Sequence, residues 1–161
     1  MPVRLVSLLG VVSLVTVLLL GGCSGRNATT PPEFAGPKAS SPVQAGMRLD
    51  MQTDQEAYFA GHPIKVRVSL VNTTNKEINF TTPTSLVFDV LYEIRDDPSV
   101  KRWSDGQQFA QVITPHTLQA GAAMSQTLEF TIVRGGPAGL WARLDTGTSV
   151  LDTAKVTITI Q

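Results

Sequence analysis

Apolar and polar side chains alternate along short runs of the sequence from residue 47 to the end. Met47, Leu49 and Met51 show the period of two. The same spacing returns in Ile64/Val66/Val68/Leu70, Phe88/Val90/Tyr92/Ile94, Leu128/Phe130/Ile132 and Val156/Ile158/Ile160. Such a period predicts strands with one buried face, and turn-forming residues interrupt it about every 8–12 residues. We therefore expect an all-β, Ig-like antiparallel β-sandwich of about seven to eight strands over residues 47–161.

The start of the chain has a different pattern, because residues 5–20 form an apolar run without any charge. Arg4 precedes the run and small residues follow it, which is typical of a secretory signal peptide. The run is shorter than the ~20 residues that cross a bilayer comfortably. A short transmembrane anchor is the alternative interpretation. We predict a signal peptide over residues 1–22.

The end of this run carries a more specific motif, Leu20-Gly21-Gly22-Cys23. It resembles the lipobox of bacterial lipoproteins. That resemblance implies cleavage before Cys23 and diacylglycerol on its thiol, with the alternative that Cys23 is an ordinary small residue. Ser24, rather than the Asp of an inner-membrane retention signal, follows Cys23. We expect a lipid-anchored protein on the extracytoplasmic side, at the outer membrane if the host is diderm.

Residues 23–46 join this motif to the alternating region. They contain four prolines and many small residues, and Phe34 and Val43 are their only apolar side chains of any size. Such a segment buries too little surface to offset the entropy lost on ordering. We expect a Pro/Ser-rich tether, disordered or extended, that follows the lipidated cysteine. The alternative is a structured extension that packs on the domain through Phe34.

Composition and charge exclude several classes of function. Lys plus Arg number 13 and Asp plus Glu number 13, so there is no excess of basic residues to bind the phosphates of nucleic acid. One cysteine forms neither an internal disulfide nor a CxxC site. The two histidines, His62 and His116, each stand beside a proline and lack a neighbouring ligand. We therefore predict no metal, no cofactor and no nucleic-acid partner.

Motifs for catalysis are also missing from the sequence. Asp96 and Asp97 precede a proline, which is typical of a turn rather than of paired catalytic carboxylates or a calcium site. The glycine-rich residues 134–139 lack the Gly-Lys-Ser/Thr end of a phosphate-binding loop. No Gly-x-Ser-x-Gly elbow is present. We predict that the protein is not an enzyme.

A series of short motifs lies between residues 64 and 132. They are Phe88-Asp89-Val90, Asp96-Asp97, Arg102-Trp103-Ser104, Phe109 and Leu118-Gln119-Ala120-Gly121. This series resembles the BsuPI family, which is described as intracellular proteinase inhibitors and related domains. The resemblance implies a sandwich that binds and inhibits a protease. The word "intracellular" does not carry over, because the lipobox places this chain outside the cytoplasm.

Loops between the strands are the candidate partner-binding sites. We select residues 96–100, 105–108 and 134–139, and within or beside them the side chains of Asp96, Asp97, Arg102, Trp103, Asp105 and Arg134. Trp103 fits either a binding anchor or a side chain that packs in the core. The expected partner is a protease. The alternative is a module without inhibitory activity that binds another envelope protein or a glycan.

Overall fold

The computed structural model describes residues 33–161, which form β-strands without a helix. The strands are β1 (Lys38–Ser40), β2 (Met47–Thr53), β3 (Ala57–Tyr58), β4 (Pro63–Asn72), β5 (Ile78–Thr82), β6 (Asp89–Ile94), β7 (Asp97–Arg102), β8 (Thr114–Leu118), β9 (Ala123–Thr131), β10 (Gly136–Asp145), β11 (Val150–Asp152) and β12 (Val156–Ile160). The prediction of an all-β sandwich is confirmed. The twelve strands exceed the expected seven or eight partly because β1, β3 and β11 have only two or three residues.

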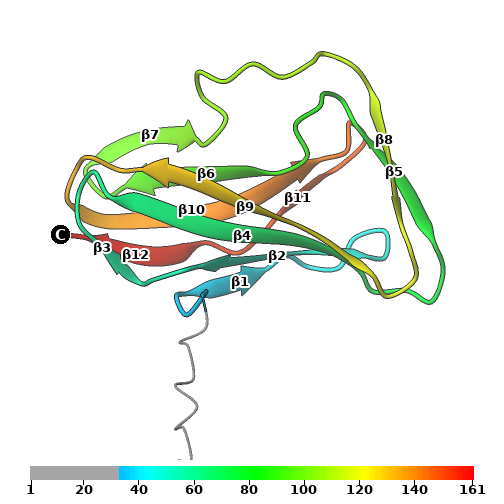
Figure 1. The fold of residues 1–161 in the computed structure, drawn as a ribbon, viewed down its shortest axis with the longest axis horizontal. Coiled ribbons are helices and arrows are strands. Elements are labelled where there is room, and N and C mark those ends of the chain that lie inside the picture. Colours follow the sequence, from blue (N-terminus) through cyan, green and yellow to red (C-terminus); the bar gives the residue numbers. More distant parts are fainter. Residues whose placement is uncertain (1–32) are drawn as a thin grey trace, which may run out of the picture. The chain divides into compact units, whose positions relative to one another are not determined.

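Two sheets form the sandwich (Figure 1). One has the strand order β1-β2-β4-β9, and the other has the order β3-β12-β10-β6-β7, with β11 paired to β10. Neighbouring strands are antiparallel, except that β3 is parallel to β12. Strands β5 and β8 form a separate two-stranded sheet at one end. The edges of the sandwich are therefore β1 and β9 on one sheet and β3 and β7 on the other.

The core lies between the two sheets and is built by the alternating positions. Met47, Leu49 and Met51 are buried on β2, whereas the residues between them are only half-buried. Strand β4 repeats this pattern, and its register places Leu70 opposite Leu49. Burial of apolar surface at ~25 cal/mol per Å² is the main stabilising contribution to such a fold. The positions that the period of two selected therefore form the core.

The structure corrects the predicted start of the domain at Met47. The Phe34 side chain is only 6% exposed, and strand β1 pairs with β2. Backbone bonds also join Gly36 N–H to the Thr53 carbonyl, at 3.0 Å, and Ser41 N–H to the Leu49 carbonyl, at 2.7 Å. Residues 33–46 thus belong to the sandwich, as the structured-extension alternative had it. Residues 23–32 of the predicted tether and the signal peptide lie outside the described residues.

The reason for this error is that strand pairing uses backbone groups. Without β1, strand β2 would expose a row of N–H and C=O groups at the edge of the sheet. The backbone of a polar segment forms hydrogen bonds with such an edge as well as the backbone of an apolar segment does. The buried ring of Phe34 then fixes the segment, with the Arg67 guanidinium 3.9 Å above the ring centroid.

Candidate functional site

Asp89, at the start of β6, organises the region that carries the sequence motifs. Its side chain is 4% exposed. One carboxylate oxygen accepts the N–H of Val90 at 2.9 Å and that of Ser104 at 3.2 Å. The other oxygen accepts the Ser104 hydroxyl at 2.7 Å and lies 4.0 Å from the Arg102 guanidinium. The separated motifs Phe88-Asp89-Val90 and Arg102-Trp103-Ser104 therefore meet at one buried carboxylate.

Trp103 connects the two sheets where their edge strands β7 and β9 lie. Its indole N–H donates to the backbone carbonyl of Glu129 on β9, at 3.1 Å, and its ring packs against the core. The Phe109 ring lies 6.1 Å from it, centroid to centroid. Gln107 donates to the Trp103 carbonyl at 2.7 Å. Because its only polar group is already bonded, Trp103 supports the loop that follows it, in agreement with the packing interpretation.

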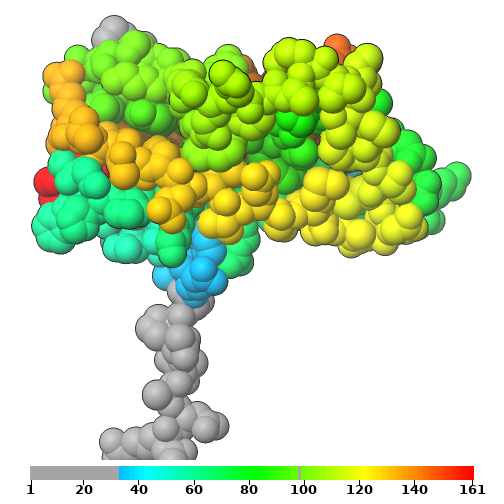
Figure 2. All heavy atoms as spheres, turned by 45° about the horizontal axis from the view of Figure 1, so that its top comes forward, coloured from blue at the N-terminus to red at the C-terminus, as the bar shows by residue number. Residues whose placement is uncertain are grey.

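That loop is the β7–β8 connection, which we define as residues 103–113. It rises from the end of β7 and crosses to β8 as a long arch (Figure 1). Val112 is 56% exposed and Ile113 is 71% exposed. In the space-filling view the yellow-green connection lies at the surface beside the golden strand β9 (Figure 2). Because these two exposed apolar side chains are adjacent and lie on a loop, they form a candidate surface for binding another protein.

Hydrogen bonds hold the arch in place at its middle. Ser85 N–H donates to the Ala110 carbonyl at 3.0 Å, and Ala110 N–H donates to the Ser85 hydroxyl at 2.9 Å. Near the far end, the Thr114 hydroxyl donates to the Val112 carbonyl at 3.1 Å. With Phe109 half-buried against Trp103, the connection is fixed at both ends and near its centre. A fixed loop loses less conformational entropy when it binds.

The other candidate residues divide between the two ends of β7. Asp96 lies in the exposed β6–β7 turn, and Arg95 N–H in that turn donates to the Pro137 carbonyl at 3.1 Å. Arg134 is exposed and lies three residues before Pro137 in the sequence. At the opposite end, Asp105 accepts the N–H of Arg102 at 2.8 Å and closes the first turn of the connection. The structure therefore does not gather the six side chains at one site.

Asp97, the first residue of β7, makes its contacts within its own hairpin. Its carboxylate accepts the hydroxyl and the N–H of Ser99, the latter at 3.1 Å, and it lies 3.2 Å from the Lys101 ammonium. Hydrogen bonds from Ser99, together with the Lys101 interaction, lower the pKa of Asp97 to about 2. The residue is therefore ionised at neutral pH and stabilises the strand locally.

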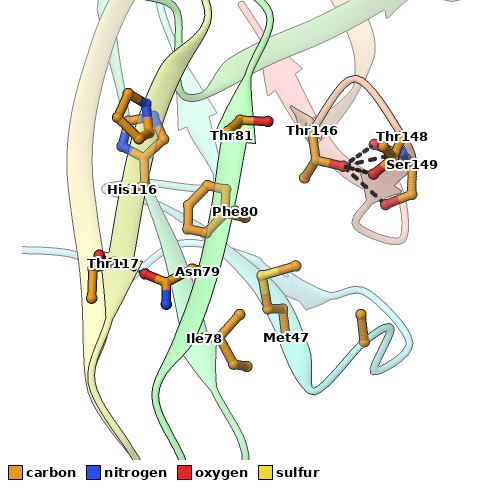
Figure 3. A pocket seen from close by; sticks show the side chains of 12 residues that line it. Met47, Ile78, Asn79, Phe80, Thr81, His116, Thr117, Thr146, Thr148 and Ser149 are labelled. Atoms are coloured by element: carbon orange, nitrogen blue, oxygen red, sulfur yellow. Dashed lines mark hydrogen bonds between the residues drawn. The ribbon is translucent and has the colours of Figure 1, made fainter.

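A groove of about 550 Å³ lies at the end of the sandwich formed by β5 and β8. Met47, Ile78 and Phe80 supply its apolar surface, and hydroxyl groups of the 146–149 turn line the side opposite β5 (Figure 3). His116 stacks on Phe80 with the ring centroids 4.9 Å apart. Burial lowers the pKa of His116 and thereby favours the neutral form of the ring. The groove can accept an uncharged group with one apolar face.

Two features of this region were missed in the sequence. Val112 and Ile113 are adjacent, outside any alternating run, and this was the available signal for an exposed apolar pair. The groove had no such signal, because its walls come from segments that are distant in the sequence.

Metal-binding clusters and membrane-spanning helices are absent from residues 33–161. This part of the chain contains no cluster of three or more His, Cys, Asp or Glu side chains placed to share a metal ion. No helix among these residues is long and apolar enough to cross a bilayer.

Comparison with protein families gives a match over residues 51–139 to the family model BsuPI, described as "Intracellular proteinase inhibitor". This match covers more than half of the 161 residues. The chain belongs to the BsuPI family. In this BsuPI chain the matched span runs from β2 into β10, so it includes Asp89, Trp103 and the whole β7–β8 connection. A comparison with curated proteins gave no match.

Several solved structures are similar to this BsuPI chain at low identity. The sporulation control protein Spo0M of Bacillus subtilis is 16% identical with a TM-score of 0.47, over 73% of this chain and 50% of the Spo0M chain. The C-terminal domain of wzt is 10% identical with a TM-score of 0.48, over 81% of each chain. The β-glucosidase EmGH1 of Erythrobacter marinus is 12% identical with a TM-score of 0.42, over 69% of this chain and 15% of the enzyme. The chain thus spans half of Spo0M, and likenesses at this level carry no argument about function.

Proposed function

We propose that this protein is a lipid-anchored proteinase inhibitor of the cell envelope, and that its β7–β8 connection enters the cleft of the target protease. The observation that carries this proposal is the exposed pair Val112 and Ile113 on a connection that Ser85 and Phe109 hold in place. Family membership supports inhibition as the activity.

The physical basis of inhibition is a substrate-like segment that binds without being released as product. Residues 107–113 have no regular secondary structure, and most of them are exposed, so a protease can reach their backbone. The bonds from Ser85 keep the segment positioned on the sandwich. Because the loop is already ordered, more of the contact energy contributes to affinity.

The sequence of the connection favours a particular class of protease. Residues 103–114 contain no Lys or Arg, whereas Val112 and Ile113 supply exposed, bulky apolar side chains. A specificity pocket with an acidic base selects basic residues, and an apolar slot selects side chains like these. We therefore propose a serine protease with an apolar specificity pocket, of which a subtilisin is an example.

The test is a titration of the Pro31–Gln161 unit against a panel of proteases, including a subtilisin, a chymotrypsin-like enzyme and a trypsin-like enzyme. The proposal predicts stoichiometric or micromolar inhibition of an enzyme with an apolar pocket and none of the trypsin-like enzyme. Absence of inhibition across the panel at micromolar concentration would refute it.

Membrane anchoring through Cys23 is the second part of the proposal, and it rests on the lipobox-like residues 20–23. Several acyl chains are needed for stable attachment, since a single chain gives only marginal binding. In a bacterial host, we expect the full chain to fractionate with membranes and to incorporate labelled fatty acid. The Cys23→Ala variant should be released or remain unprocessed, and a variant that is processed and retained normally would contradict the anchor.

The groove beside β5 favours a second candidate function, that of a module which binds another envelope protein or a glycan without inhibiting a protease. Its apolar lining and hydroxyl groups suit an uncharged ligand. In a crosslinking experiment on membranes, Thr148→Trp would fill the open side of the groove. Loss of a crosslinked non-protease partner in this variant alone would favour the second candidate.

A further inference from the structure

The outer face of the β1-β2-β4-β9 sheet carries a basic hollow of about 660 Å³. Lys38 of β1, Arg48 of β2 and Arg67 of β4 supply its positive charges, and Asp50 is the acidic side chain that lines it. Polar uncharged groups of Ser40, Gln52 and Ser69 complete much of the surface. We define these lining residues as the basic hollow.

Strand register brings the charges of the basic hollow together. Lys38 lies opposite Gln52, and Gln52 lies opposite Arg67, so the three form one row across the sheet. Two strand spacings separate Lys38 from Arg67, which places their backbones about 10 Å apart. A row of this width can contact adjacent phosphate groups on a surface.

Two of the three cations are available for a ligand. Arg48 donates to both carboxylate oxygens of Asp50, each at 2.8 Å, so this pair is largely self-neutralised. Within residues 33–161, no hydrogen bond or ion pair engages the side-chain nitrogens of Lys38 or Arg67. The Arg67 guanidinium instead stacks on the Phe34 ring. Stacking leaves the N–H groups at the edge of the guanidinium free to bind phosphate oxygens.

The positive charge of this face contrasts with the rest of the domain. The chain has 13 basic and 13 acidic residues, and Arg4 and Arg26 precede residue 33, which leaves 11 basic and 13 acidic residues in the described part. On the outer face of this sheet, Lys65 and Glu129 lie opposite each other. Adding them to the hollow gives four cations and two anions. A domain of net charge −2 therefore presents one face of charge +2.

The position of β1 connects this face to the membrane. Lys38 is part of β1, the first strand after the start of the described chain. Cys23 precedes Glu33 by ten residues, which can span at most ~35 Å. Strand β1 and the β7–β8 connection lie on opposite sides of the domain (Figure 1). An anchor at Cys23 would hold β1 near the bilayer and leave the connection pointing away.

We propose that the basic hollow binds the anionic headgroups of a phospholipid bilayer and orients the domain with the outer face of the β1-β2-β4-β9 sheet towards the membrane. The partner is chosen by charge complementarity and by the short distance between β1 and the predicted anchor. Each cation that approaches an anionic bilayer strengthens binding about fivefold. The inference extends the anchoring part of the proposed function, but it does not need lipidation to be tested.

The test uses the Pro31–Gln161 unit, which is compact and has its own core. Its binding to vesicles of phosphatidylcholine alone, and of phosphatidylcholine with 30% phosphatidylglycerol, is measured by sedimentation at low ionic strength. We expect binding only to the anionic vesicles, and the binding should weaken as salt is added because ions screen exposed charges. Lys38→Glu/Arg67→Glu should reduce binding at least tenfold.

The matched control is Lys76→Glu/Arg134→Glu, which changes net charge equally at two exposed positions outside the basic hollow. It should stay within about threefold of the unmodified domain. Charge reversal at Arg67 also changes its contact with Phe34, so a second variant, Lys38→Gln/Arg67→Gln, removes the two charges without reversing them. This variant should be folded by circular dichroism and should also lose binding to anionic vesicles. Equal binding to both vesicle types, no binding, or equal losses in the two double variants would overturn the proposal. Membrane association of the full chain through Cys23 would survive that failure, so the two results are distinguishable.

Discussion

Residues 33–46 and the β7–β8 connection both lie outside the alternating runs of the sequence, but they have very different structures. Both are rich in small and polar residues, and both contain a phenylalanine, Phe34 in the first and Phe109 in the second. The first segment pairs with β2 and buries its ring, whereas the second leaves Val112 and Ile113 exposed. Residues 33–46 are ordered because the edge of β2 is available for β1 to pair with. The connection has no such partner along its length and is held by single contacts.

This contrast separates stability from recognition. Contacts of residues 33–46 are distributed along β2, so they contribute to the folding of the sandwich. Contacts of the connection are concentrated at Asp89, Trp103 and Ser85, and they position the segment while leaving its outer side free. Substitutions in the two segments should therefore affect different measurements.

The largest expected effect comes from Asp89→Ala, which removes the common support of β6 and the connection. Three hydrogen bonds are lost, and the buried N–H of Val90 and the part-buried N–H of Ser104 are left without this acceptor. We expect a loss of about 3 kcal/mol in the free energy of unfolding, measured with urea. Asp105→Ala, at an exposed carboxylate with one backbone bond, should cost less than about 1 kcal/mol. Equal losses would show that burial of Asp89 is unimportant.

Phe34→Ala should have the next largest effect and would test whether residues 33–46 are part of the domain. The ring is buried at the sheet edge, outside the main core cluster. Truncation of a core phenylalanine costs about 3–5 kcal/mol, so at this edge position we expect a loss of about 2–3 kcal/mol. Val43→Ala, at an exposed position of the same segment, should change stability by less than about 0.5 kcal/mol. If Phe34→Ala unfolds at the same urea concentration as the unmodified domain, the segment does not stabilise the sandwich.

Ser85→Ala should have a smaller effect on the free energy of unfolding and should mainly loosen the β7–β8 connection. The variant loses the hydroxyl that accepts Ala110 N–H but keeps the backbone bond, so the cost should be about 1 kcal/mol or less. We expect faster hydrogen exchange at Ala110 and weaker inhibition of the target protease. Unchanged exchange at Ala110 would show that Ser85 does not hold the arch.

The smallest effect concerns Asp97, at the end of β7 far from the connection. Its pKa is lowered to about 2, so the stabilising charge is present above the ordinary value near 3.9 and is lost as pH falls towards 2. The unmodified domain should melt slightly above Asp97→Asn at pH 6, and the difference should shrink as pH falls towards 2 and disappear below it. A difference that stays constant between pH 6 and pH 2 would exclude the carboxylate charge as its cause.

Much of the fold could be predicted from the sequence, because alternation reports which face of a strand is buried. Leu49, Val66 and Ile158 were identified in this way. The strand β1 was not, since pairing through backbone groups leaves little trace in side-chain polarity. The motif residues Asp89 and Ser104 were recognised, but their contact depends on a hairpin that the sequence alone does not position.

The candidate site was predicted only in part. Residues 105–108 belong to the β7–β8 connection, whereas the exposed pair Val112 and Ile113 was missed. Asp97, Trp103 and Asp105 were selected as binding residues, and each is engaged in contacts within the domain. Charged and aromatic residues in a turn often serve the turn itself. Exposure, which depends on the whole fold, is what distinguishes the two roles.

The most direct test of the account compares two double variants in the protease titration. Val112→Asp/Ile113→Asp places charges on the connection, and Phe59→Asp/Val133→Asp does the same at exposed apolar positions elsewhere, which are 62% and 80% exposed. We predict that the first loses inhibition at least tenfold, while both melt within a few degrees of the unmodified domain. Equal inhibition by the two double variants would contradict the assignment of binding to the β7–β8 connection.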